Sequence, residues 1–271
     1  MKRDEKAQVF ICALMILPAV ALGTAAMIYG GVSPLLWGQQ AAAWAILALL
    51  TGLLYRTAMR ISAEVLSAFF LIFLAVTLLG QEAGGARRWV NLIVFHVNAA
   101  HLILPALIAV SHSLKKPWIA LLIAALILSF QPDFSQLTAL CAAGIPVLFR
   151  QGKKQTWASI LILSVLLIRC MNTPVSLEPE PYCEGILSML SDVSYLLPVI
   201  GWAALMVVPA YWLVQFCTKG NAKALSLAVY YAVSLLFALS GEYPVLFMGF
   251  GLSPIAGHYL AYICSSAAEK K

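Results

Sequence analysis

The sequence predicts an all-α fold: a polytopic integral membrane protein with about ten transmembrane helices. Of its 271 residues, 62% are hydrophobic and 10% are charged, whereas a soluble domain carries roughly 25% charged residues. The apolar residues form long runs without the alternation of a barrel strand, and in lipid only helices and closed barrels satisfy their own backbone. A water-soluble fold cannot bury so much apolar side chain, so a helical membrane protein is expected.

Ten apolar runs, joined by short polar segments, define the expected helices. Several are shorter than the roughly 20 residues that a straight span needs, so their limits are approximate. The first run is expected to stay as a helix, because no cleavage site of a signal peptide follows it. The expected helices cover Val9–Tyr29, Ala41–Tyr55, Val65–Leu79, Ala99–Val110, Pro117–Phe130, Phe134–Phe149, Trp157–Ile168, Tyr195–Phe216, Ala224–Leu239 and Pro244–Ile263.

The distribution of positive charge predicts that both termini are cytoplasmic. Lys and Arg concentrate on the cytoplasmic side of membrane proteins, and one span more or fewer would invert every later loop. The net charge of +6 therefore reflects topology, and nucleic-acid binding is not indicated. With ten spans, only Arg87, Arg88 and Arg169 fall outside, and the inner side holds Lys2, Arg3, Lys6, Arg56, Arg60, Lys115, Lys116, Arg150, Lys153, Lys154, Lys219, Lys223, Lys270 and Lys271.

Two outer loops, residues 80–98 and 169–194, stand out within the single transmembrane domain, residues 1–271. The outer side collects the acidic residues, and the second loop has three prolines followed by GILSML, which is expected to be a partly buried re-entrant or interfacial segment. An acidic, proline-bearing outer face is where chemistry is expected. Its acids are Glu82, Asp133, Glu178, Glu180, Glu184, Asp192 and Glu242.

The first outer loop carries two arginines beside a tryptophan, in the sequence GARRW. The planar guanidinium groups of Arg87 and Arg88 are suited to bidentate phosphate binding, and Trp89 can anchor the loop at the membrane interface. Ordinary contact with phospholipids is the alternative. His96 and His101 are five residues apart, and either face a cavity near the outer end of the fourth helix or pack as hydrogen-bonded histidines.

Glu184 is the best candidate for a general base, because it follows a constrained proline loop and precedes an apolar segment. Asp133, in SFQPDF between the fifth and sixth helices, serves the outer site or simply caps the next helix. Cys170 and Cys183 are both expected outside, where they either form a disulfide or remain free.

Several common site types are absent from the sequence. It has no Walker loop, no GxSxG, no HExxH and no dinucleotide fingerprint, which removes the usual nucleotide-binding and hydrolase interpretations. The six cysteines show no CxxC pair and no metal-type spacing with histidine, so a zinc site is not expected.

Four motifs occur in an informative order: GARRW after the third span, QPD between the fifth and sixth, an acid in a proline-bearing loop before the eighth, and MGFGLSPIAG near the end. In this order they resemble the shape, elongation, division and sporulation (SEDS) family, which includes the RodA and FtsW peptidoglycan glycosyltransferases. The resemblance covers the whole chain and indicates a compact, diverged member.

The resemblance implies a function and a place for it. Such a protein would polymerise lipid II at the outer face of the bacterial cytoplasmic membrane, with a class B penicillin-binding protein as partner, in cell shape, division or sporulation. A divalent cation, Mg²⁺ or Mn²⁺, would help neutralise the pyrophosphate, and no organic cofactor is implied. By resemblance Glu184 takes the place of the family's essential Asp as catalytic base, and the substrate-binding residues are Arg87, Arg88, Trp89, Asp133, Asp192 and His101.

Departures from the family pattern keep a second function open. Residues 95–101 read FHVNAAH, without the family's Pro and Glu, and Ser135 replaces a glycine. A catalytically inactive homologue, acting as a lipid-binding scaffold or as a regulator of a transpeptidase, is therefore the alternative. A small transporter is a third reading, suggested by His258 in a last span rich in proline and glycine.

Overall fold

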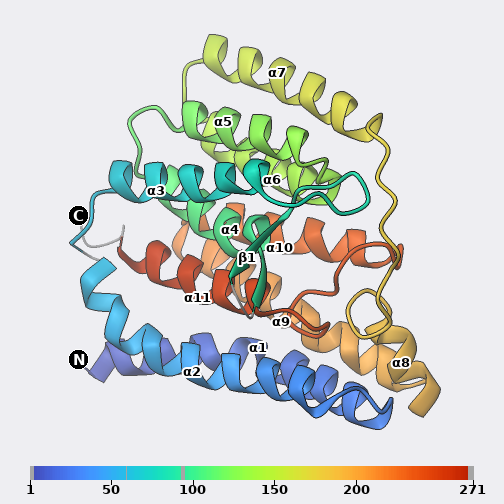
Figure 1. The fold of residues 1–271 in the computed structure, drawn as a ribbon. Helices are drawn as coiled ribbons and strands as arrows, with labels where there is room; N and C mark the ends of the chain where they lie inside the picture. The colour runs from blue at the N-terminus through green and yellow to red at the C-terminus, as the bar shows by residue number, and fades with distance from the viewer. Residues whose placement is uncertain (1–2, 59, 93–94, 268–271) are drawn as a thin grey trace.

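The structure is a computed structural model that describes residues 3–58, 60–92 and 95–267 and forms a bundle of side-by-side helices (Figure 1). The predicted helical fold is confirmed. Lys2, Lys270 and Lys271, which the charge pattern assigns to the inner side, lie outside the described residues. The elements are α1 (Arg3–Tyr29), α2 (Pro34–Ala58), α3 (Ala63–Val76), the 3-10 helix η1 (Thr77–Leu79), β1 (Trp89–Leu92), β2 (Phe95–Asn98), α4 (Ala99–Ser111), α5 (Pro117–Phe130), α6 (Phe134–Leu148), α7 (Lys153–Met171), α8 (Ile186–Val193), α9 (Leu197–Lys219), α10 (Ala222–Ala238) and α11 (Leu252–Ala267).

The helix order agrees with a multi-pass membrane protein. Four of the described helices, α1, α2, α7 and α9, contain segments long and apolar enough to cross a bilayer, and shorter apolar helices stand between them. In Figure 1 the start of α1 and the end of α11 lie at the same end of the bundle, as two cytoplasmic termini require. The number of spans remains a prediction.

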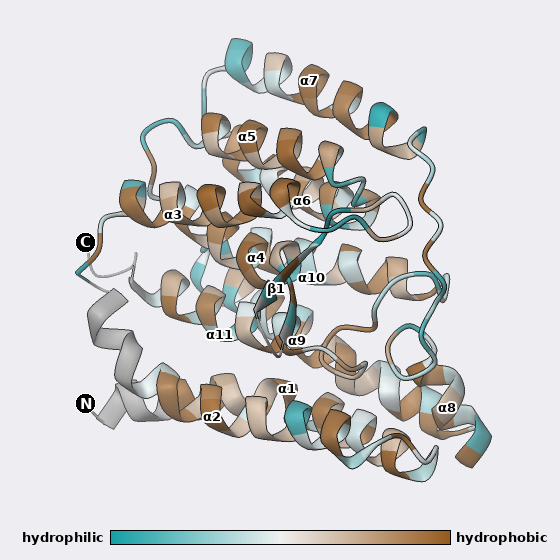
Figure 2. Ribbon diagram, in the orientation of Figure 1, coloured by the Kyte–Doolittle hydropathy of each residue, from teal (hydrophilic) through white to brown (hydrophobic). Residues whose placement is uncertain are grey.

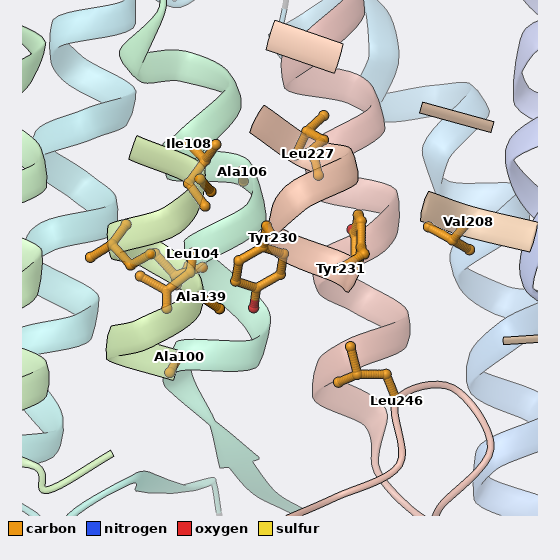
Figure 3. Close-up of a cluster of buried hydrophobic side chains, with 14 of the residues drawn as sticks. Ala100, Leu104, Ala106, Ile108, Ala139, Val208, Leu227, Tyr230, Tyr231 and Leu246 are labelled. Carbon is orange, nitrogen blue, oxygen red and sulfur yellow. The ribbon is translucent and has the colours of Figure 1, made fainter. Parts of the chain in front are cut away.

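Small side chains allow the central helices to approach closely. Figure 3 shows Tyr230 and Tyr231 of α10 within a cluster that includes Ala100 and Ala106 of α4. Alanine brings helix backbones together without a gap, as is usual for helices packed within a membrane. The hydroxyl of Tyr230 donates to Oε1 of Gln136 on α6 at 2.6 Å, so the buried phenol has a polar partner.

The hydropathy of the elements follows their position. In Figure 2 the helices α3, α5 and α7 are largely apolar, and polar residues gather in the segments that join helices. Many large apolar side chains are exposed, including Leu49 at 74% and Leu161 at 67%. In water such a surface would be unfavourable, whereas it suits contact with lipid chains.

The all-α prediction missed a two-stranded hairpin in the first outer loop. Strands β1 and β2 pair antiparallel, with Trp89 opposite Asn98 and Val90 opposite Val97. Branched and aromatic residues favour extended backbone in these strands. The expected partly buried GILSML segment is present as the short helix α8, with Ile186 and Leu190 buried.

The last helix begins later than predicted. Residues 244–251 form an irregular, mostly buried segment, and α11 begins at Leu252 instead of Pro244. The Nε2 amide of Gln40 on α2 donates to the carbonyls of Phe247 and Met248 at 3.2 and 3.0 Å. The segment therefore finds part of its backbone hydrogen bonding outside a helix, which hydropathy alone does not reveal.

Candidate functional site

A cavity of about 430 Å³ lies where the two outer loops meet the 244–251 segment. The first turns of α4, α6 and α11 and the base of the β1–β2 hairpin also contribute to its wall. Of the seven site residues predicted from sequence, five line it: Arg88, Trp89, His101, Asp133 and Glu184. These residues come from four separate stretches of the sequence, so the fold brings the predicted site together.

Arg88 and Asp133 form a buried ion pair at the base of the cavity. Nε of Arg88 lies 3.7 Å from Oδ2 of Asp133, and the two side chains are 10% and 1% exposed. An Nη2 hydrogen of Arg88 is donated to the carbonyl of Pro132. Because 3.7 Å is too long for a hydrogen bond, the pair is held by charge, and the guanidinium keeps donor capacity at the cavity wall.

Asp133 also begins α6. Its Oδ1 accepts hydrogen bonds from the backbone N–H of Gln136 at 3.3 Å and from the hydroxyl of Ser135 at 3.0 Å. The helix cap expected from the sequence is therefore confirmed, and the second carboxylate oxygen faces Arg88. The hydrogen bond from Ser135 supports the orientation of Asp133.

Glu184 lies at the end of a tight turn that forms part of the cavity wall. Its Oε2 accepts a hydrogen bond from the backbone N–H of Glu180 at 2.9 Å, and the side chain is half-buried. That hydrogen bond fixes the carboxylate against its own loop and leaves the second oxygen for other partners. The proline-bearing sequence therefore presents an oriented carboxylate at the cavity.

The Glu184 turn is bound tightly to the 244–251 segment. The backbone N–H of Phe250 donates to the carbonyl of Tyr182 at 2.8 Å, and Sγ of Cys183 donates to the carbonyl of Phe250 at 3.3 Å. A Cβ placed on Gly249 would lie 2.3 Å from the carbonyl oxygen of Cys183. Only glycine allows this approach, which gives a structural reason for Gly249 in the MGFGLSPIAG motif.

Ser253, which sequence reasoning overlooked, lies in the wall near the predicted His101. The hydroxyl of Ser253 accepts a hydrogen bond from the backbone N–H of Asn98 at 2.8 Å and so joins the hairpin to α11. His101 is 6% exposed, and its Nδ1 has no hydrogen-bond partner among the described residues. Gly257 packs against the carbonyl of His101. Ser253 and Gly257 lie within the motif near the end of the chain, so the motif did point to this region.

Two predicted site residues lie outside the lining. Arg87 is on the surface, where its Nη2 pairs with Oε2 of Glu82 at 3.1 Å, and Asp192 is exposed on α8. Adjacent residues on an extended segment point to opposite sides, so Arg88 turns inward and Arg87 outward. His96 lines the cavity, and its Nδ1 lies 2.6 Å from Oδ1 of Asn91.

The possible disulfide of the second outer loop does not form. Cys170 and Cys183 are both free thiols. Burial, followed by the nearby Glu184, raises the pKa of Cys183 well above its ordinary value. His258, the residue behind the transporter reading, is buried on α11, and its Nε2 donates to the carbonyl of Cys12 at 3.1 Å. Its ring is therefore held by α1 within the bundle.

The cavity lining is strongly acidic. Five carboxylates and one guanidinium line it, and the carboxylates are Asp133, Glu178, Glu180, Glu184 and Glu242. Within the described ranges, no three His, Cys, Asp or Glu side chains gather as a ready-made metal site. Such a lining attracts cations, and Mg²⁺ commonly uses one or two carboxylates together with substrate phosphates.

Comparison with known proteins agrees with this description. No protein-family model matches the chain. The probable peptidoglycan glycosyltransferase FtsW of Francisella salina is 28% identical over 131 residues, a match that covers 41% of this chain and 33% of that protein. The match thus spans about a third of the length of this relative.

Solved structures match over nearly the whole chain. Crystal structures of the rod shape determining protein RodA of Thermus thermophilus, native and with a point mutation, give TM-scores of 0.67 at 17% sequence identity. Each match covers 96% of this chain and at least 95% of the other. The chain is therefore a polytopic helical membrane protein with the RodA fold. The resemblance to RodA and FtsW that its motifs predicted is confirmed.

Proposed function

We propose that the protein is a peptidoglycan glycosyltransferase that polymerises lipid II at the outer face of the bacterial cytoplasmic membrane. The observation that carries this proposal is the shared cavity, in which Glu184 and Arg88 stand on walls built by different outer loops. A carboxylate and a guanidinium across one cavity are the groups needed to deprotonate a sugar hydroxyl and to hold a pyrophosphate.

In the proposed reaction Glu184 acts as general base on the acceptor sugar. Its carboxylate takes the proton of the acceptor hydroxyl while that oxygen bonds to the anomeric carbon of the donor. The bond between this carbon and the pyrophosphate oxygen breaks, and the leaving pyrophosphate keeps the electron pair. Arg88 stabilises the developing negative charge, with Asp133 holding the guanidinium in place.

The charge of the lining supports a divalent cation as cofactor. Pyrophosphate entering a cavity with five carboxylates and one guanidinium meets net repulsion unless a cation accompanies it. The carboxylates of Glu178, Glu180 and Glu242 are the available protein ligands. The bound cation would neutralise the pyrophosphate, and Mg²⁺ and Mn²⁺ are both suited to oxygen ligands.

A separate apolar groove fits the isoprenoid part of the proposed substrate. It has a volume of about 440 Å³ and lies between α2, α3 and α11, with Leu50, Phe69 and Ile263 in its wall. On α11 this groove extends to Ala256, two residues from Pro254 at the outer cavity. A lipid-linked substrate can thus place its chain along α11 and its headgroup at Glu184.

The ion pair between Arg88 and Asp133 favours a second candidate, an inactive homologue. Because Arg88 already has Asp133 as its partner, the protein can hold a lipid-linked ligand without turning it over. In that case it would act as a scaffold or regulator of a transpeptidase. A class B penicillin-binding protein is the proposed partner in either case.

One experiment separates these candidates. Purified protein is mixed with lipid II and Mg²⁺ or Mn²⁺, alone and with its cognate transpeptidase, and the glycan products are sized. Polymer made by the native chain and lost in Glu184→Gln supports the enzyme. Asp192→Asn is the matched control, because this exposed carboxylate lies outside the cavity and its loss should leave synthesis intact. Lipid II binding without product from the native chain would favour the scaffold.

A further inference from the structure

A second cavity, of about 500 Å³, lies at the end of the bundle that the charge pattern assigns to the cytoplasm. Its wall is formed by the residues that follow α4 and α6, the last turn of α9 and the first turn of α10. The lining consists of His112, Ser113, Arg150, Lys219, Asn221, Ala222 and Lys223. None of these residues takes part in the proposed glycosyl transfer.

The charge of this cavity is opposite to that of the outer one. Arg150, Lys219 and Lys223 line it, and the lining contains no carboxylate. Within the described part of the chain, no carboxylate lies within ion-pair distance of Arg150 or Lys219. Arg150 and Lys219 therefore repel one another across the cavity unless an anion joins them.

Lys223 is the buried member of this group. Its side chain is 6% exposed, and its Nζ donates to the carbonyl of Ser265 at 2.8 Å, which ties α10 to the end of α11. A buried ammonium is unfavourable unless the surroundings compensate for its charge. The position of Lys223 is therefore fixed by the fold, whereas Arg150 and Lys219 are exposed and free to close on a ligand.

The N-terminus of α10 adds backbone N–H donors to the cavity, and His112 orients the side chain of Arg150. Asn221 caps α10, with its Oδ1 accepting from the N–H of Lys223 at 3.1 Å, so the positive end of the helix dipole faces the cavity. Nη1 of Arg150 lies 3.4 Å from Nδ1 of His112, and Nε2 of His112 lies 3.0 Å from the hydroxyl of Ser226. A neutral His112 that accepts from Arg150 and donates to Ser226 would orient the guanidinium at the rim.

We propose that this inner cavity binds a phosphate group, carried by an anionic phospholipid of the inner leaflet or present as free phosphate. Basic pockets between transmembrane helices on the cytoplasmic side are suited to phosphate headgroups, and Arg150 offers a bidentate donor. Arg150, Lys219 and the α10 N-terminus would then share one ligand. The proposal is independent of the glycosyl transfer at the outer face.

The test compares phospholipid and free phosphate as ligands of the full chain in dodecylmaltoside. Native mass spectrometry measures retention of phosphatidylglycerol and phosphatidylcholine, and thermal unfolding is followed with and without inorganic phosphate. The probe variant Arg150→Gln/Lys219→Gln removes two exposed cations from the cavity. The control Lys153→Gln/Lys154→Gln removes two exposed cations from the same face, outside the lining.

A phospholipid ligand predicts preferential retention of phosphatidylglycerol, weakened roughly 10- to 30-fold in the probe variant and changed less than about twofold in the control. A free phosphate ligand predicts no lipid preference, together with a rise of unfolding temperature in phosphate that the probe variant alone loses. An equal loss in both double variants, or no response of the native chain to either ligand, would overturn the proposal.

Discussion

The ion pair between Arg88 and Asp133 can be tested by a double-mutant cycle. Asp133→Asn keeps the oxygen that caps α6 but removes the charge facing Arg88. Breaking a well-formed buried pair costs about 3–5 kcal/mol, because the remaining charge is left uncompensated. At 3.7 Å and without a hydrogen bond the pair is looser, so we expect Asp133→Asn to lower the free energy of unfolding by about 2–3 kcal/mol. Asp133→Ala should lose about 1 kcal/mol more, from the cap.

The measurement is reversible unfolding in mixed micelles with increasing sodium dodecyl sulfate. Arg88→Gln and Arg88→Gln/Asp133→Asn complete the cycle, and we expect the double variant to be more stable than the sum of the single effects predicts. A coupling energy near zero would mean that the two side chains do not sense each other, and the role of Asp133 in orienting Arg88 would be refuted. Both single variants should also lower polymer synthesis, because each disturbs the guanidinium at the cavity.

Three further predictions concern the outer turn and the inner end. Gly249→Ala should destabilise the protein by about 1–3 kcal/mol and reduce polymer synthesis, since its Cβ would collide with Cys183. Gly38→Ala, on α2 and in open space, should leave synthesis unchanged and should not lower the unfolding midpoint. Maleimide at pH 8 should label exposed Cys217 quickly and Cys183 slowly, because burial raises the pKa of Cys183 well above its ordinary value. Labelling is followed by mass spectrometry, and equal rates for the two thiols would contradict this. Burial, followed by the charges of Arg150 and Lys223, lowers the pKa of His112 from 6.5 to about 4. The free energy of unfolding should therefore fall as the pH drops from 6.5 to about 4, because the unfolded chain binds the proton first. In unfolding titrations His112→Gln should make the free energy of unfolding depend less on pH over this range.

The sequence predicted the fold class well because the bilayer restricts what a chain of this composition can do. Long apolar runs identified the helices, and their order agrees with the structure up to α10. Most of the predicted site residues also line one cavity. Arg88, Asp133 and Glu184 come from three polar segments at one end of the bundle. Topology alone places such segments near one another.

The failures have a common physical origin in irregular backbone. Pro244 was placed in a helix because hydropathy does not distinguish a buried loop from a buried helix, yet Gln40 supplies that loop with hydrogen-bond donors from α2. Arg87 and Arg88 could not be told apart by sequence, because their opposite directions follow from extended backbone before β1. The inner cavity went unpredicted because its cations come from separate helix ends that topology alone treats as equivalent.

The attachment of residues 244–251 has a mechanical consequence. One side of this segment is fastened to α2 through Gln40, and the other to the Glu184 turn through Phe250. A tilt or shift of α2, which has large apolar side chains exposed on its surface, would therefore move the wall on which Glu184 stands. A change in bilayer thickness, or a neighbouring protein that contacts α2, would therefore change the position of Glu184. The displacement would be transmitted through the backbone of residues 244–251.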